Sequence, residues 1–181
     1  MLYLEIPPKE MFDERTMEFI ELPAKKLQME HSLVSLSKWE SKWHKPFLVP
    51  ENRTHEETLD YFRCMTITQN VDPSIYETFD QSDIQTILDY IDDPMTATWF
   101  NERQGPGPRS REIVTAEVIY YDMIALNIPF ECQKWHLNRL ITLIKVCKIK
   151  NQPPSKMSKA EALNQQRALN AQRKAKMNTK G

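Results

Sequence analysis

Glycine is nearly absent from this chain: among 181 residues it occurs only as Gly105, Gly107 and Gly181. Loops that hold phosphate groups need glycine where the backbone approaches the ligand closely, and the nucleophile elbow needs it at a sharp turn. The chain therefore has no dinucleotide-binding fingerprint, no Walker loop and no nucleophile elbow. This scarcity argues against a doubly wound nucleotide-binding enzyme and against a glycine-rich β-sandwich.

The net charge of −1 conceals an acidic part and a basic part. Residues 1–133 carry 12 Lys and Arg against 24 Asp and Glu, a net charge of −12. Residues 134–181 carry 12 Lys and Arg against a single acid, Glu161, a net charge of +11. We expect the basic end either to dock on the acidic segment 72–93, in the same or a neighbouring copy, or to stay free to bind a partner.

Cysteine usage and hydropathy indicate a protein of a reducing compartment. Cys64, Cys132 and Cys147 are far apart and odd in number, which predicts free thiols and no zinc site. The first residues do not resemble a signal peptide. The most apolar run, Ile113–Leu126, contains two acids and is shorter than the ~20 residues of a membrane span. It predicts a buried central helix and no membrane anchor.

Residues 1–30 have the alternation of short strands. Leu2, Leu4 and Ile6 alternate with other residues until Pro7, and a second alternation precedes Glu30. We predict two or three strands in a small antiparallel β unit.

Helical spacing of apolar residues dominates the middle of the chain. Thr54 with Glu57, and Ser82 with Gln85, have the spacing of capping boxes that begin helices. Helices are predicted around residues 33–45, 54–70, 82–93, 113–126 and 131–147, with a turn or short helix at 72, a short strand at 95–100 and a loop at 102–109.

A proline pair at Pro153 and Pro154 separates the last segment, where Ser158 and Glu161 form a third capping box. We predict a basic helix that frays into a disordered end. The predicted fold is mainly α: a β-rich segment (1–30) packed on a compact helical core domain (31–150), followed by a basic, flexible C-terminal tail (151–181).

No catalytic or metal-binding pattern is complete. Ser35 and Lys38 form an S-x-x-K without the other elements of that chemistry, and His55 begins a zincin-like pattern whose second histidine is replaced by Leu59. The acids of 72–93 include no calcium-binding loop. We therefore predict a protein that is not an enzyme and needs no cofactor or metal.

Four large aromatic side chains are candidates for binding another protein. If exposed, they would form a protein-binding groove, and if buried they belong to the core. The sequence leaves both readings open for Trp39, Trp43, Trp99 and Trp135.

The basic end is the feature that suggests nucleic acid. Its candidate contacts are Arg167, Arg173, Lys174 and Lys176. Because no aromatic residue follows Trp135, the tail has nothing to stack on bases, and only non-specific phosphate contacts are available. Nucleic-acid binding is therefore the lesser alternative.

Several segments resemble the tail assembly chaperones of long-tailed, siphovirus-like bacteriophages. They are LVSLSKWESKW at 33–43, TITQNVDP at 66–73, IALNIPFECQKWHLNRL at 124–140 and RALNAQR at 167–173. The resemblance spans most of the chain.

The resemblance implies a folding and assembly factor in the host cell cytoplasm. Such proteins bind the tape measure protein, keep it soluble, help to recruit tail tube subunits and leave before the virion is finished. A homo-oligomer is compatible with this role. The alternatives are a structural virion component of the neck or tail completion, and a nucleic-acid-binding accessory protein.

Overall fold

The computed structural model describes residues 1–13, 17–49, 53–100, 113–152 and 159–177. The chain is mainly helical with a small antiparallel β unit at its N-terminus, and a basic helix lies near its C-terminus, which confirms the predicted fold class. It divides into two compact units, Met1–Cys147 and Lys148–Gly181. The predicted loop 102–109, the third capping box and the frayed end lie outside the described residues, in whole or in part.

The β unit contains four strands, one or two more than predicted, arranged as one long hairpin. Strand β1 pairs with β4 and β2 with β3, both antiparallel. Ile6 lies opposite Lys25 and Lys9 lies opposite Leu22, so the register continues unchanged between the two sheets. The strands are β1 (Leu2–Ile6), β2 (Lys9–Asp13), β3 (Glu18–Leu22) and β4 (Lys25–Met29).

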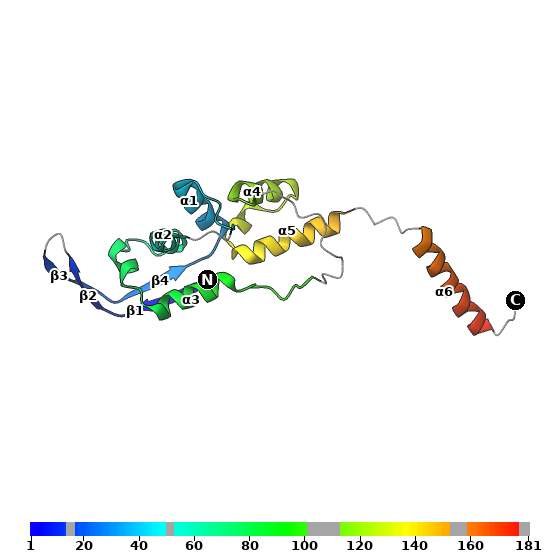
Figure 1. Cartoon of the computed structure of the whole chain (residues 1–181), viewed down its shortest axis with the longest axis horizontal. Helices are drawn as coiled ribbons and strands as arrows, with labels where there is room; N and C mark the ends of the chain where they lie inside the picture. Colours follow the sequence, from blue (N-terminus) through cyan, green and yellow to red (C-terminus); the bar gives the residue numbers. More distant parts are fainter. Residues whose placement is uncertain (14–16, 50–52, 101–112, 153–158, 178–181) are drawn as a thin grey trace. The chain divides into compact units, whose positions relative to one another are not determined.

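Prolines explain why the hairpin is two sheets. Pro7, Pro8 and Pro23 fall between the paired segments and have no N–H to donate to the ladder. Sheet β1–β4 buries apolar side chains against the helices, whereas β2–β3 reaches beyond the helices in Figure 1 and exposes the cross-strand pair Phe12 and Phe19.

Helices follow the hairpin along the chain. They are α1 (Leu33–Trp43), α2 (His55–Met65), the 3₁₀ helix η1 (Pro73–Thr78), α3 (Gln81–Asp92), α4 (Ala116–Ala125), the 3₁₀ helix η2 (Phe130–Lys134), α5 (Leu137–Asn151) and α6 (Lys159–Met177). The predicted capping box of α2 is confirmed, since the Thr54 side chain accepts the Glu57 N–H and the Glu57 carboxylate accepts the Thr54 N–H. Helix α3 begins earlier than predicted because Asp80, not Ser82, caps it.

Two helices are shorter than predicted because the chain leaves them to pair with β4 and the start of α1. Ile67 donates its N–H to the Gln28 carbonyl at 2.7 Å, which ends α2 at Met65 instead of near Asn70. His136 forms a bridge with Ser32, so α5 begins only at Leu137 and η2 replaces its predicted first turn. Residues 95–100 form no strand.

Left-handed backbone positions are filled without glycine in the described part of the chain. His44 ends α1 at φ 55°, and Asn127 follows α4 at φ 52°. Asparagine tolerates this region better than most residues because its short polar side chain bonds locally. Scarce glycine therefore does not prevent sharp helix ends.

Helix α4 is peripheral, which corrects its predicted central position. Its inner face packs against α1, beside which it lies in Figure 1, through buried Ala116, Ile119 and Met123. Its outer face remains exposed at Tyr121 and Ile124. The apolar pattern predicts the helix correctly, but part of that helix's surface is left uncovered by the described residues.

A buried carboxylate fixes α4 on α1. Glu40 is 7% exposed, and its Oε1 accepts the Phe47 N–H at 2.8 Å while its Oε2 accepts the Ala116 N–H at 2.7 Å. Ala116 is the first residue of α4, and Thr115 provides no side-chain cap. Glu40 thus satisfies an N-terminal N–H of α4 from another helix, where a negative charge also interacts favourably with the helix dipole.

Replacing Glu40 with alanine should lower the free energy of unfolding by about 3 kcal/mol, because two buried N–H donors lose a charged acceptor. Urea denaturation followed by circular dichroism measures the change. Glu56→Ala, which removes an exposed glutamate of α2, is the control and should cost less than about 1 kcal/mol. Equal losses in the two variants would contradict the role of Glu40.

Candidate protein-binding surface

The two tryptophans of α1 bind α2 within the fold. The indole N–H of Trp39 donates to the Glu57 carbonyl at 2.9 Å, and that of Trp43 donates to the Asp60 carboxylate at 2.8 Å. Trp39 is 1% exposed and Trp43 is half-buried. The sequence left a core and a surface position open for these residues. The structure places Trp39 in the core, so Trp39 is no longer a candidate for binding a partner.

The other two tryptophans differ in exposure. Trp99 is 80% exposed. Trp135 is half-buried, and the Arg139 guanidinium lies 4.4 Å from the centre of its ring. Trp99 is thus the tryptophan with most surface for a partner, and partner binding at Trp43, Trp99 and Trp135 remains a prediction.

Sequence reasoning missed a larger apolar surface on the outside of α4. Tyr121 is 68% exposed and Ile124 is 61% exposed. Tyr120 lies beside them on the helix, and its ring centre is 6.4 Å from that of Phe130 in η2. Tyr120, Tyr121, Ile124 and Phe130 are called the α4–η2 surface below.

The local geometry of this surface follows from the sequence. On the helix, Ile124 is a neighbour of Tyr121 at a spacing of three and of Tyr120 at a spacing of four, and Pro129 precedes the 3₁₀ turn that carries Phe130. The Tyr120 hydroxyl donates to the Gln133 side chain at 3.0 Å, which connects α4 to η2. The signal was in the sequence, because a helix that is apolar all round must bury its second face somewhere.

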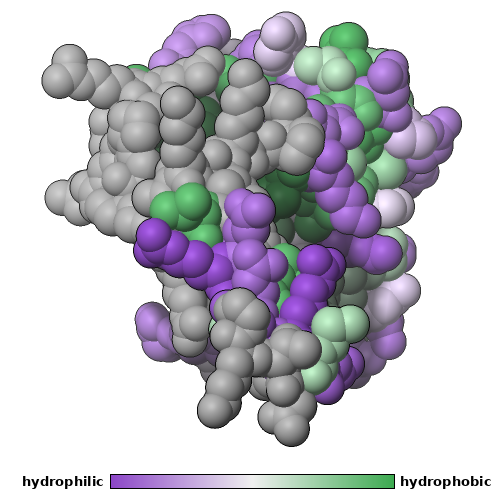
Figure 2. Space-filling view, turned by 90° about the vertical axis from the view of Figure 1, so that its right-hand side faces the viewer, coloured by the Kyte–Doolittle hydropathy of each residue, from purple (hydrophilic) through white to green (hydrophobic). Residues whose placement is uncertain are grey.

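Clusters of exposed aromatic and aliphatic side chains suit protein contacts. Exposed apolar residues that gather within a polar surround are typical of interaction sites. On the face drawn in Figure 2, hydrophilic residues predominate among the coloured ones, and apolar residues form small patches between them. Tyrosine and phenylalanine also supply much contact area with few rotatable bonds.

The predicted basic contacts lie on α6. All four side chains, Arg167, Arg173, Lys174 and Lys176, are exposed. This helix also exposes Leu163 and Leu169, each about half accessible. The predicted docking of this segment on residues 72–93 remains a prediction.

A buried histidine lies where β4 meets α1. The Nδ1 atom of His31 is 2.6 Å from the Tyr61 hydroxyl, and the His136 ring centre is 5.1 Å from that of His31. Burial, together with His136 and the Arg53 cation, lowers the pKa of His31 to about 3. Burial raises the pKa of Tyr61 well above its usual value. Both side chains are therefore neutral near pH 7.

The part of the chain that the structure describes contains no cluster of metal ligands, and its Cys64 thiol is not activated. No three His, Cys, Asp or Glu residues there come together as a set of metal ligands. Burial raises the pKa of the Cys64 thiol to about 11, so this side chain stays protonated at neutral pH. No helix within the described ranges is long and apolar enough to cross a bilayer.

Comparisons with known proteins identify no relative of this chain. No protein-family model, no curated protein and no solved structure matches the chain.

The depressed pKa of His31 predicts a loss of stability in acid. Between pH 6.5 and pH 3 the unfolded chain binds a proton at this ring and the folded chain does not, so the free energy of unfolding falls as the pH falls. From pH 7 to pH 5, wild type should lose about 2 kcal/mol more than His31→Asn, measured by urea denaturation at both pH values. A slope in His31→Asn as steep as that of wild type would refute the assignment.

Proposed function

We propose that this protein is a tail assembly chaperone of a long-tailed bacteriophage, acting in the host cell cytoplasm. It binds the tape measure protein, keeps it soluble and helps to recruit tail tube subunits before it leaves the assembling tail. The segments at 33–43, 66–73, 124–140 and 167–173 support the proposal through their resemblance to that family. The observation that carries it is the exposed α4–η2 surface.

A tape measure protein is long and largely helical, so its monomer exposes apolar stripes before the tube forms around it. An amphipathic helix of this kind can lay its stripe on the α4–η2 surface by packing helix on helix. Aromatic residues often supply most of the binding energy at such interfaces. Tyr121 and Ile124 offer the most exposed apolar area on α4.

Release of the client requires that each contact be weak. A long client can bind many copies of the protein, so modest affinities at single sites still give high total affinity. The basic helix α6 adds charge that accelerates association and that salt screens. These properties suit a factor that acts during assembly and then dissociates.

Co-expression with the tape measure protein tests the proposal. Wild type should keep most of the tape measure protein in the soluble fraction, whereas Tyr121→Asp combined with Ile124→Asp should leave most of it in the pellet, because two carboxylates would be buried under the client. Quantitative gel densitometry of both fractions measures the effect.

The matched control is Ile67→Asp, which changes an apolar residue of comparable exposure outside α4. This variant should solubilise the client as well as wild type. Circular dichroism confirms that each variant is folded. If the tape measure protein were equally soluble with and without the wild-type protein, the proposal would be wrong.

A structural role in the virion is the alternative, as a neck or tail-completion component. Mass spectrometry of purified particles separates the two roles. A chaperone should be absent from finished virions, whereas a structural component should be present in stoichiometric amount. If the protein were present in finished virions in stoichiometric amount, the structural role would be favoured and the chaperone proposal would be wrong.

Exposed Arg and Lys side chains on α6 favour one further candidate function, non-specific binding of nucleic acid. We expect binding of a fluorescent single-stranded oligonucleotide to be weak at low salt and undetectable near physiological salt, because phosphate contacts alone hold it. Deleting residues 155–181 should abolish the low-salt binding. Tight binding at physiological salt that depends on this segment would favour the nucleic-acid function instead.

A further inference from the structure

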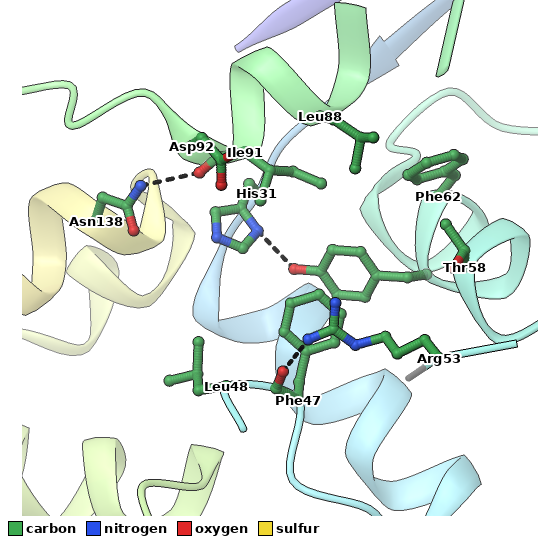
Figure 3. A pocket seen from close by; sticks show the side chains of 11 residues that line it. His31, Phe47, Leu48, Arg53, Thr58, Phe62, Leu88, Ile91, Asp92 and Asn138 are labelled. Atoms are coloured by element: carbon green, nitrogen blue, oxygen red, sulfur yellow. Dashed lines mark hydrogen bonds between the residues drawn. The ribbon is translucent and has the colours of Figure 1, made fainter. Parts of the chain in front are cut away.

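A second site lies apart from the α4–η2 surface, in a pocket lined by residues of α2, α3, α5 and the segment between α1 and α2. Its volume is about 360 Å³, which is enough for a large side chain with its flanking backbone. One wall is apolar and includes Phe62, Leu88 and Ile91, whose side chains surround the cavity in Figure 3.

The base of the pocket is preformed. The Tyr61 hydroxyl and His31 are joined at 2.6 Å, and the Phe47 ring stacks on that of Tyr61 at 3.9 Å between centres. Tyr61 and Phe47 are buried among the core side chains. A ligand therefore meets a rigid aromatic base and pays little entropy to order it.

Arg53 is a cation at the rim. Its guanidinium lies 3.9 Å from the centre of the Phe47 ring and donates to the Phe47 carbonyl. No carboxylate among the described residues forms a salt bridge with it. Partial burial lowers the pKa of Arg53, whereas Tyr61 and Glu57 act in the opposite direction, and the residue as a whole is exposed. An acidic group arriving here would find a fixed planar cation with N–H donors to spare.

Asp92 is an anion, and in Figure 3 the His31 ring lies between it and Arg53. It is exposed and is the last residue of α3, a position that the helix dipole makes unfavourable for a negative charge. The last turn of α3 has no basic residue, and no ion pair of Asp92 occurs among the described residues.

Asn138 fixes the chain at this end of the pocket. Its amide N–H group donates to the Ile91 carbonyl at 2.9 Å and to the Asp93 carbonyl at 2.8 Å. The contact joins the start of α5 to the last carbonyls of α3, which have no partner within their own helix. The position of Asp92 relative to the cavity is therefore set by the fold.

We propose that this pocket binds a helical segment of a partner protein through one large apolar side chain, with an acidic residue on one side of it and a basic residue on the other. The apolar anchor packs against Phe62 and Leu88, the acid pairs with Arg53 and the base pairs with Asp92. Charges three or four residues before and after an anchor lie on the same helix face.

Charge complementarity favours an occupant that carries both signs of charge. Asp92 would repel a ligand with only negative charge, and Arg53 would repel one with only positive charge. A purely apolar ligand would pair with neither charge. The inference rests on the proposed function only for the identity of the partner, which would be a helix of the tape measure protein.

Synthetic peptides test the pocket without the tape measure protein. Four blocked helical peptides, each roughly 16 residues long, share one leucine anchor and differ only in the two flanking residues: Glu and Lys, Glu and Glu, Lys and Lys, or Gln and Gln. Fluorescence anisotropy measures their binding to the full chain. Wild type should bind the Glu and Lys peptide about tenfold more tightly than each of the others.

Charge changes at the rim should redirect this preference. Asp92→Lys makes both positions basic and should select the Glu and Glu peptide, whereas Arg53→Glu makes both acidic and should select the Lys and Lys peptide. Arg53→Gln and Asp92→Asn provide neutral versions, which should lose about tenfold for the Glu and Lys peptide. Because Asp92 is exposed, its variants should keep the wild-type melting temperature.

Two controls test the cavity itself. Replacing the leucine anchor with alanine should abolish binding, and Leu88→Trp should abolish it by filling the pocket. The proposal is overturned if affinity is independent of the flanking charges, if the alanine peptide binds equally well, or if free leucine binds and the peptides do not. A negative peptide-binding result would leave the co-expression test of the proposed chaperone unaffected. Conversely, a soluble tape measure protein in that test would not support the proposed role of the pocket.

Discussion

A single carboxylate connects three parts of the first unit. Glu40 leaves α1 and accepts N–H groups from Phe47, in the segment between α1 and α2, and from Ala116, at the start of α4. A buried charge is costly unless polar partners surround it, so both contacts help to keep Glu40 in the core. The outward direction of α4 and the position of the Phe47 ring therefore depend on the same side chain.

A second set of contacts fixes the helices on the β unit. His31 accepts the Leu137 N–H with its carbonyl at 2.7 Å, and the neighbouring Ser32 caps α1. Glu30 accepts the Tyr90 hydroxyl at 2.6 Å. Three consecutive residues between β4 and α1 thus contact α1, α3 and α5, which explains why polar residues at this junction are buried.

The helices were predictable from the sequence because their signals are local. Thr54 and Glu57 lie three residues apart, and this spacing alone predicted the start of α2. The end of α2 was not predictable, because it depends on Ile67 pairing with Gln28 in a distant strand. Strand β2 was not predicted, because residues 9–13 show no clear alternation of their own. The strand is recognised by its pairing with β3, which the sequence alone does not reveal.

Both candidate sites required the structure. Apolar residues around all of 113–126 predicted a helix with two faces to cover, but not which of its faces would lack a neighbour in the fold. The tryptophans were recognised as core or surface candidates, and only three-dimensional contacts separate Trp39 from Trp99. The pocket escaped detection because Arg53, Asp92 and Asn138 come from segments far apart in the chain, with no shared motif.

The unbroken register of the hairpin has a consequence for how this protein can change during evolution. Because side chains alternate between faces, inserting or deleting one residue near Pro7 would turn Phe12 and the rest of β2 to the opposite face. The pairs from Lys9 to Asp13 would survive within their own hairpin, and a matching change near Pro23, on the returning strand, would restore the register between the two sheets. Length variation in this arm should therefore occur as coupled events on both strands, or else be confined to its tip.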